Sequence, residues 1–154
     1  MTTPELRRVD PHGPEATALT QEFFAAVAAR YPDFDPARQP PAPLEAFTPE
    51  RGGAFLVASL EGALAGCGGL QRLDETTAEV RRVFVREAAR RRGVARALVL
   101  GLVEAAGALG YRRVRLDTGD RLPEARALFT ALGFRDIDDY NDNPFAAYWM
   151  ELEL

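Results

Sequence analysis

The sequence contains few residues of the kinds that stabilise disulfide or zinc scaffolds. In 154 residues there is one cysteine, Cys67, and one histidine, His12. A single cysteine cannot form an intramolecular disulfide, and this pair does not match the ligand spacing of a zinc cage. We therefore expect no structural disulfide and no metal.

Long apolar runs are missing as well. No stretch of about 18 apolar residues, the length that spans a bilayer, occurs in the chain. Residues 1–10 include the charged Glu5, Arg7, Arg8 and Asp10 and lack the apolar run of a signal peptide. We therefore expect a cytoplasmic protein with no membrane partner.

Lysine is absent too. All 19 basic residues are arginine, and 23 acidic residues bring the formal net charge to -4. This charge argues against a protein that binds nucleic acid over its whole surface, so no nucleic-acid partner is expected. A weaker alternative is a nucleic-acid-binding module that uses the arginine cluster at residues 86–96.

What is present is typical of a globular domain, with 47% hydrophobic and 27% charged residues. A chain of this length suits one domain, residues 1–154, that buries roughly 70% of its unfolded surface. Hydrophobic periodicity predicts helices over residues 15–30, 94–109 and 123–132. It predicts strands over residues 5–10, 54–60, 63–73, 77–85, 114–116, 134–137 and 148–154.

This order of elements predicts an α+β fold, with a mixed, mostly antiparallel, twisted sheet and helices on both faces. The proline-rich stretch 32–49 is expected to hold a short helical turn at most. Regular alternation in strand 77–85 is expected to place on one face Glu79, Arg81, Val83 and Val85, and on the other Val80, Arg82 and Phe84.

The segment 83–98 joins a strand to a helix through a loop rich in arginine and small residues. The first turn of a helix presents unpaired N–H groups, and Gly93 and Ala95 leave room for a phosphate to approach the backbone. The pattern therefore indicates an anion site, with a solvated charged face as the alternative. The glycine motifs of P-loop and dinucleotide-binding proteins are absent.

The six residues Arg90-Arg91-Arg92-Gly93-Val94-Ala95 match Q/R-x-x-G-x-G/A, the cofactor motif of the GNAT superfamily of N-acetyltransferases. The chain resembles that family in three further places: A-E-V-R-R-V-F-V before the motif, and L-D-T-G and P-E-A-R-A-L-F…L-G-F after it. The resemblance implies the GNAT (acyl-CoA N-acyltransferase) fold and acetyl-CoA as cosubstrate. It further implies acetyl transfer to a small-molecule or peptide amine by direct attack, with sequential kinetics. Homodimers are common among such proteins.

The resemblance also implies where the cofactor binds. Its pantetheine arm would pair with the strand that holds Val83 and Val85, and its pyrophosphate would bind the amides that begin the helix. The N–H of Val83 would stabilise the oxyanion. The implied cofactor-binding residues are Val83, Phe84, Val85, Arg90, Arg91, Arg92, Gly93, Val94, Ala95, Arg96 and Phe129.

Glu79 is the predicted general base, because a protonated amine must lose a proton before it attacks and some GNAT members carry a catalytic Glu at this position. The alternative is that Glu79 only pairs with Arg81 or Arg72 on the sheet surface.

Two residues depart from the family pattern. Phe129 stands where many members carry a Tyr that protonates the leaving thiolate, and Leu122 stands where an Asn contacts the pantetheine arm. Either the thiolate leaves without an acid, or Tyr140, Tyr148 or water replaces that Tyr. The alternative function is therefore an acyl-CoA-binding sensor with weak or no turnover.

The remaining candidates have structural interpretations. We expect His12 at the surface and Cys67, Phe23 and Phe24 in the core. The acidic run is expected to be a solvated loop, with an acidic mouth for a cationic amine as the alternative; it consists of Asp136, Asp138, Asp139 and Asp142.

Overall fold

The structure is a computed structural model that describes residues 2–38, 40–121 and 123–154. Within these residues one sheet of seven strands has the order β1-β2-β3-β4-β5-β7-β6. Its strands are β1 Glu5–Arg8, β2 Ala54–Leu60, β3 Ala63–Arg72, β4 Thr77–Val85, β5 Arg113–Thr118, β6 Arg135–Ile137 and β7 Tyr148–Glu153. Its helices are α1 Pro14–Arg30, α2 Val94–Ala108 and α3 Pro123–Ala131.

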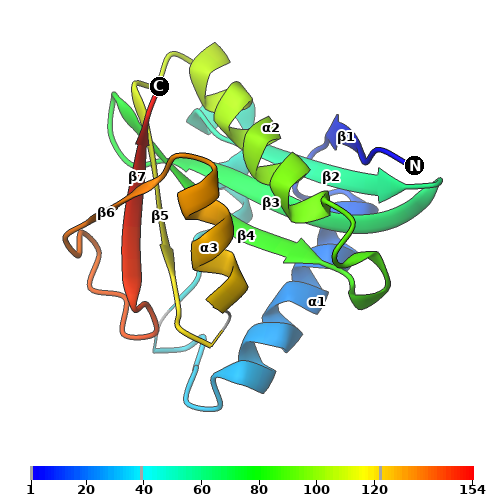
Figure 1. Ribbon diagram of the computed structural model, residues 1–154, viewed down its shortest axis with the longest axis horizontal. Helices are drawn as coiled ribbons and strands as arrows, with labels where there is room; N and C mark the ends of the chain where they lie inside the picture. Colours follow the sequence, from blue (N-terminus) through cyan, green and yellow to red (C-terminus); the bar gives the residue numbers. More distant parts are fainter. Residues whose placement is uncertain (1, 39, 122) are drawn as a thin grey trace.

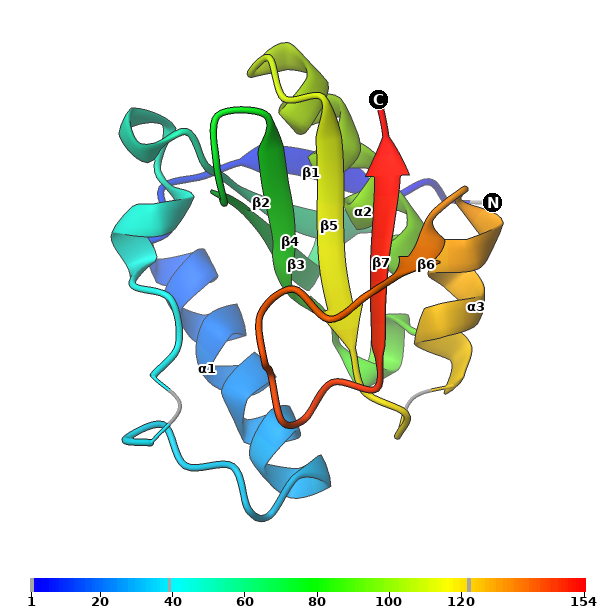
Figure 2. The ribbon, with the colours of Figure 1, turned by 90° about the vertical axis from the view of Figure 1, so that its left-hand side faces the viewer.

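The helices cover both faces of the sheet (Figures 1 and 2). Helix α1 lies against one face, whereas α2 and α3 lie against the other. All strand pairs are antiparallel except β4 and β5, which are parallel. The predicted fold class is confirmed, and the ends of the predicted elements lie within two residues of the observed ones.

The proline-rich stretch behaves as predicted. Its helical structure among the described residues is the short 3-10 turn Leu44–Phe47 and the start of a second one, Pro49–Arg51. None of the helices in the described residues combines the length and apolar character needed to cross a membrane.

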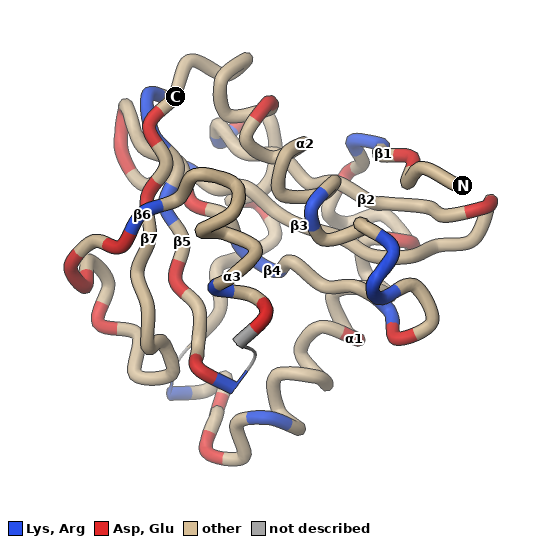
Figure 3. Tube along the Cα trace, in the orientation of Figure 1, with Lys and Arg blue, Asp and Glu red and all other residues tan. Residues whose placement is uncertain are grey.

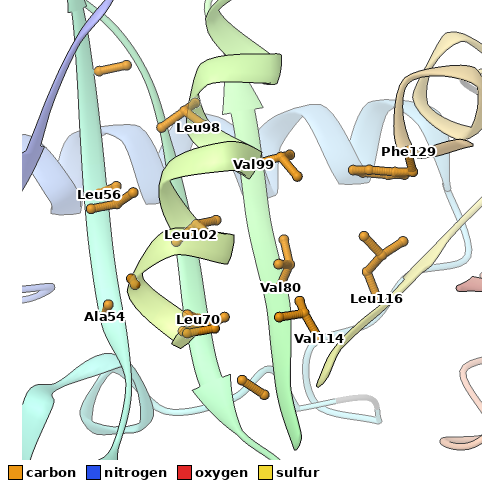
Figure 4. Close-up of a cluster of buried hydrophobic side chains, with 14 of the residues drawn as sticks. Ala54, Leu56, Leu70, Val80, Leu98, Val99, Leu102, Val114, Leu116 and Phe129 are labelled. Atoms are coloured by element: carbon orange, nitrogen blue, oxygen red, sulfur yellow. The ribbon is translucent and has the colours of Figure 1, made fainter. Parts of the chain in front are cut away.

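The core forms two layers, one on each side of the sheet. The larger layer lies under α2, where Leu98, Leu102 and Val99 are fully buried against β2, β3 and β4 (Figure 4). The smaller layer lies under α1 and is built around Leu19 and Phe47. Each helix therefore contributes an apolar stripe to the sheet face that it covers.

Strand β3 is rich in glycine because both layers pack directly on its backbone. A Cβ at Gly68 would lie 2.9 Å from a methyl of Leu102, and one at Gly69 would lie 2.7 Å from the ring of Phe47. At Gly66 the obstacle is backbone, since a Cβ would lie 2.3 Å from the carbonyl oxygen of Phe84 in β4. Larger residues there would force β3 and β4 apart.

Replacing Gly66 with Ala should therefore lower the free energy of unfolding by about 1–3 kcal/mol, because the strand backbone must move to admit the methyl group. The matched control is Gly107→Ala on α2, where an added Cβ meets nothing within 4 Å. The control should raise stability by roughly 0.5–1 kcal/mol through helix propensity. Chemical denaturation measures both, and equal effects of the two variants would contradict this account of β3.

Candidate functional site

The site begins where β4 and β5 stop pairing. The two parallel strands share only the pairs Thr77↔Arg113, Ala78↔Val114 and Glu79↔Arg115. Beyond Glu79 they diverge, and the rest of β5 is paired with β7 alone (Figure 1). The divergence opens a notch in the middle of the sheet.

A cleft of about 790 Å³ occupies this notch and reaches both faces of the sheet. On the face of α2 and α3 its lining includes Arg90, Ala95 and Phe129. On the face of α1 the lining includes Phe24, Tyr31 and residues 141–145. Two molecules entering from opposite faces could therefore meet between β4 and β5.

One wall of the cleft is the C-terminal half of β4, where the strand contains a bulge. Arg81 lies opposite Gly69 and Phe84 opposite Cys67, so Arg82 and Val83 share a single partner position on β3. Arg82 adopts the left-handed region, with φ of 58°. An extra residue of this kind reverses the alternation of all side chains that follow it.

The predicted regular alternation of β4 is therefore wrong beyond Arg81. Val83 and Val85 pack with Val80 in the layer under α2, whereas Phe84 packs in the layer under α1. Glu79 does not share a face with the two valines, because the bulge lies between them.

The predicted anion site lies at the α2 end of the cleft. Gly93 precedes α2 with φ of 81°, and a Cβ added there would meet nothing within 4 Å, so the backbone is open to an approaching group. Several basic residues lie in and beside this loop (Figure 3). Arg92 pairs with Glu61 at 3.0 Å, and the Arg90 Nε donates to the Val85 carbonyl at 3.4 Å. The first N–H groups of α2 lack intrahelical acceptors, as at any helix start.

Glu79 is 1% exposed and accepts four hydrogen bonds. Its Oε1 accepts from Gln71 Nε2 and Arg81 Nε, both at 2.7 Å, and its Oε2 accepts from Arg81 Nη2 at 3.0 Å and the Tyr140 hydroxyl at 2.6 Å. The predicted pairing with Arg81 is confirmed, but the Glu79 carboxylate is buried and not on the sheet surface. Glu79 itself is absent from the cleft lining, whereas Gln71 and Arg81 belong to it.

Arg81 connects the two diverging strands. Besides Glu79 it binds Asp117 of β5, with an Nη1–Oδ1 distance of 3.1 Å. Asp117 Oδ2 in turn accepts from Asn141 Nδ2 at 2.5 Å, and Trp149 Nε1 donates to Asn141 Oδ1 at 2.8 Å. The network attaches the loop before β7 to the sheet and so positions one side of the cleft.

The tyrosines lie in different surroundings. Burial, with a further contribution from the Glu79 carboxylate, raises the pKa of Tyr140 and keeps it a neutral hydrogen-bond donor. The guanidinium carbon of Arg126 lies over the Tyr148 ring, 4.2 Å from the ring centroid. Neither lines the cleft, whereas Tyr31 does. Phe129 is 8% exposed and packs on Phe134, and Leu122 lies outside the described residues.

Several other sequence predictions can be checked against this arrangement. His12 is a surface residue and Cys67 a core residue, as predicted, and burial raises the pKa of the Cys67 thiol to about 12. Phe23 and Phe24 are not core residues, since both line the cleft. Their helical spacing could not distinguish a face that meets a core from one that meets a cavity.

Two of the four aspartates of the acidic run are engaged in local structure. Asp136 pairs with Arg126 at 2.6 Å, and Asp139 accepts hydrogen bonds from the amides of Asn141 and Asp142. Only Asp142 of the run lines the cleft within the described part of the chain. The surface-loop interpretation thus accounts for most of these carboxylates.

Comparison with known proteins shows which family the chain matches. The model of the acetyltransferase (GNAT) family matches residues 20–134. Two curated relatives are the uncharacterized N-acetyltransferases YsnE of Bacillus subtilis, 32% identical over 90 residues, and YjgM of Escherichia coli, 36% identical over 90 residues. The matches cover 55% and 56% of this chain and 60% and 54% of those proteins. The chain therefore spans little more than half the length of these relatives.

Solved structures share the fold across the whole chain. A GNAT family acetyltransferase from Staphylococcus aureus Mu50 superposes with a TM-score of 0.80 at 18% identity, covering 98% of this chain and 99% of that one. A GNAT family acetyltransferase from Elizabethkingia anophelis, solved with acetyl-CoA bound, gives 0.69 at 16% identity, with 98% of each chain covered.

The buried network around Glu79 yields a stability prediction. Replacing Tyr140 with Phe leaves one lone pair of a buried carboxylate without its donor, so the free energy of unfolding should fall by about 1.5–3 kcal/mol. The control Tyr148→Phe removes a hydroxyl outside the network and should change stability by less than about 0.5 kcal/mol. Urea denaturation of both variants tests this. A Tyr140→Phe variant as stable as the wild type would contradict the described geometry.

Proposed function

The chain belongs to the GNAT acetyltransferase family, and from this we propose that it is an N-acetyltransferase that moves the acetyl group of acetyl-CoA to a primary amine. The observation that carries the proposal is a single cleft that joins an anion-binding helix start to a notch between two diverging strands. The acetyl-CoA bound to the Elizabethkingia anophelis protein of the same fold supports this choice of cosubstrate.

The helix start suits the pyrophosphate of acetyl-CoA. The amides from Arg91 to Arg96 would bind it, and the open backbone at Gly93 would allow its close approach. Side chains supply additional charge, and Arg90 lines the cleft at this end. The pantetheine arm would then follow the edge of β4 that β5 leaves unpaired, beside Val83 and Val85.

The reaction we propose is direct attack. The amine nitrogen attacks the thioester carbonyl, a C–N bond forms, the C–S bond breaks, and its electron pair leaves on sulfur. The N–H of Val83 is proposed to donate to the oxygen that becomes negative during attack. The proton lost by the amine must pass to a base.

The leaving thiolate need not be protonated by the enzyme. Phe129 occupies the cleft wall without a proton to give, but a thiol with a pKa near that of free cysteine, about 8.5, is a moderate leaving group. This same feature motivates the alternative, an acyl-CoA-binding sensor with little or no turnover.

Glu79 is proposed as the general base, acting through an intervening water that carries the proton. Two of its three partners, Gln71 and Arg81, line the cleft, so the carboxylate lies directly behind the cleft wall. A base in this position would matter most at low pH, where fewer amine molecules are already deprotonated.

The function is tested by measuring free thiol release from acetyl-CoA across a panel of primary amines. We expect release that depends on the amine, with intersecting double-reciprocal plots, because both substrates must be bound before attack. Parallel plots, which indicate a covalent acetyl-enzyme, would exclude direct attack. Thermal stabilisation by acetyl-CoA without thiol release for any amine would favour the sensor.

The cofactor position is tested by Ala95→Glu. The new carboxylate would lie in the first turn of α2 and repel the pyrophosphate, so KM for acetyl-CoA should rise at least about tenfold. Leu100→Glu is the matched control, because Leu100 is 44% exposed on the same helix. Similar KM values for the two variants would show that the cofactor does not bind at the start of α2.

The base is tested by Glu79→Gln. We expect kcat/KM to fall mainly at low pH, with partial recovery at high pH where free amine is abundant. Because the substitution also weakens the pair with Arg81, thermal denaturation should be followed alongside. A loss of stability with an unchanged shape of the pH–rate profile would remove Glu79 from the proton path.

A further inference from the structure

Two neighbouring arginines of β4 have opposite surroundings. Arg81 is bound by two carboxylates, those of Glu79 and Asp117. Arg82 has no carboxylate partner among the residues that the structure describes. It is nevertheless only 7% exposed, and it lines the cleft.

The hydrogen bonding of the Arg82 guanidinium is incomplete. Its Nη2 donates to the Ala42 carbonyl, whereas its Nη1 is buried without any partner in the described chain. The rings of Phe47 and Phe24 lie 4.7 and 5.1 Å from its central carbon. Aromatic faces attract a cation, but they do not accept its remaining hydrogen bonds.

No acid in the described part of the chain pairs with the Arg82 guanidinium. Burial and the neighbouring Arg81 both lower the pKa of Arg82, which records an environment unfavourable to the cation. Cys67 packs behind it and stays a neutral thiol. Glu22, the acid on the adjoining part of α1, is engaged by Arg86 at 2.7 and 3.0 Å. A buried guanidinium of this kind is a site for an anion supplied from outside the protein.

The position of Arg82 identifies which molecule would supply the anion. The helix start that suits pyrophosphate lies on the face of α2, whereas Arg82 contacts Phe24 of α1 and the Ala42 carbonyl on the opposite face. The amine acceptor of the proposed reaction is the molecule expected there. The rest of this side is largely apolar and aromatic, with Phe23, Val27, Tyr31, Phe34 and Phe145 in the lining.

We infer that the acceptor is a free amino acid with an apolar or aromatic side chain, whose carboxylate binds Arg82. The carboxylate would accept hydrogen bonds from the guanidinium, the amine would extend into the notch, and the side chain would contact the aromatic wall. This inference rests on the proposed acetyltransferase function. Cationic acceptors such as polyamines are disfavoured, because they would bring a second positive charge to Arg82.

The test compares acceptors that differ only in the carboxylate. Acetylation of L-phenylalanine is measured against phenethylamine, and that of L-leucine against isoamylamine, in the wild type and in Arg82→Asn. Asparagine is chosen because it tolerates the left-handed backbone at this position. The wild type should favour each amino acid at least about tenfold in kcat/KM, and the variant should lose most of that preference.

Arg30→Gln is the control, since it removes another cation from the lining of the same cleft. It should leave the ratio between amino acid and decarboxylated amine unchanged. A wild type that prefers the decarboxylated amines, or an Arg82→Asn variant that keeps the wild-type ratio, would overturn the inference while the acetyltransferase function stands.

If no amine is acetylated, binding replaces turnover as the readout. Calorimetric titration of L-phenylalanine and L-leucine into the protein saturated with CoA should give binding in the wild type and at least tenfold weaker binding in Arg82→Asn. Absence of binding in the wild type would overturn the inference. Binding without turnover would instead count against the proposed catalysis alone.

Discussion

The ion pair between Arg81 and Asp117 crosses the gap between two strands that have stopped pairing. From Thr77 to Glu79, backbone pairing connects β4 to β5. Beyond that point the Arg81–Asp117 ion pair connects the two strands. The pair is completed by Glu79 on one side and by Asn141 on the other. A sheet can thus open in its centre without losing its alignment, because partly buried charges that are paired hold the edges at a set distance.

The bulge at Arg82 is the second constraint, and it determines what the opened edge presents. By reversing the alternation, it directs Val83 and Val85 to the α2 layer and leaves Arg82 among the aromatic rings on the other face. A left-handed arginine is a costly conformation for a non-glycine residue. Its occurrence beside the cleft fits the general tendency of such conformations to lie at functional sites.

Much of the fold was predictable from the sequence because its elements have strong local signals. Apolar periodicity and the following Gly110 predicted α2, and the Arg90–Ala95 match predicted an anion site at its start. The bulge was not predictable, because arginine has no preference for the left-handed region and the pattern of β4 reads as a regular strand. The sequence also could not predict that Arg82 lacks a carboxylate partner among the described residues. That depends on which carboxylates the tertiary fold places beside Arg81 and Arg86.

The two sides of the cleft are built from different kinds of structure. The side nearer α2 consists of the ladder of β4 and the start of a long helix, where backbone groups carry the interactions. The side nearer α1 consists mainly of side chains from that helix, from residues 40–42 and from loop 141–145, and those two segments belong to no strand. Substitutions there can reshape the α1 side of the cleft and leave the main-chain framework of the α2 side intact. Under the proposed function, a protein built this way can change its acceptor over evolutionary time and retain its acyl donor.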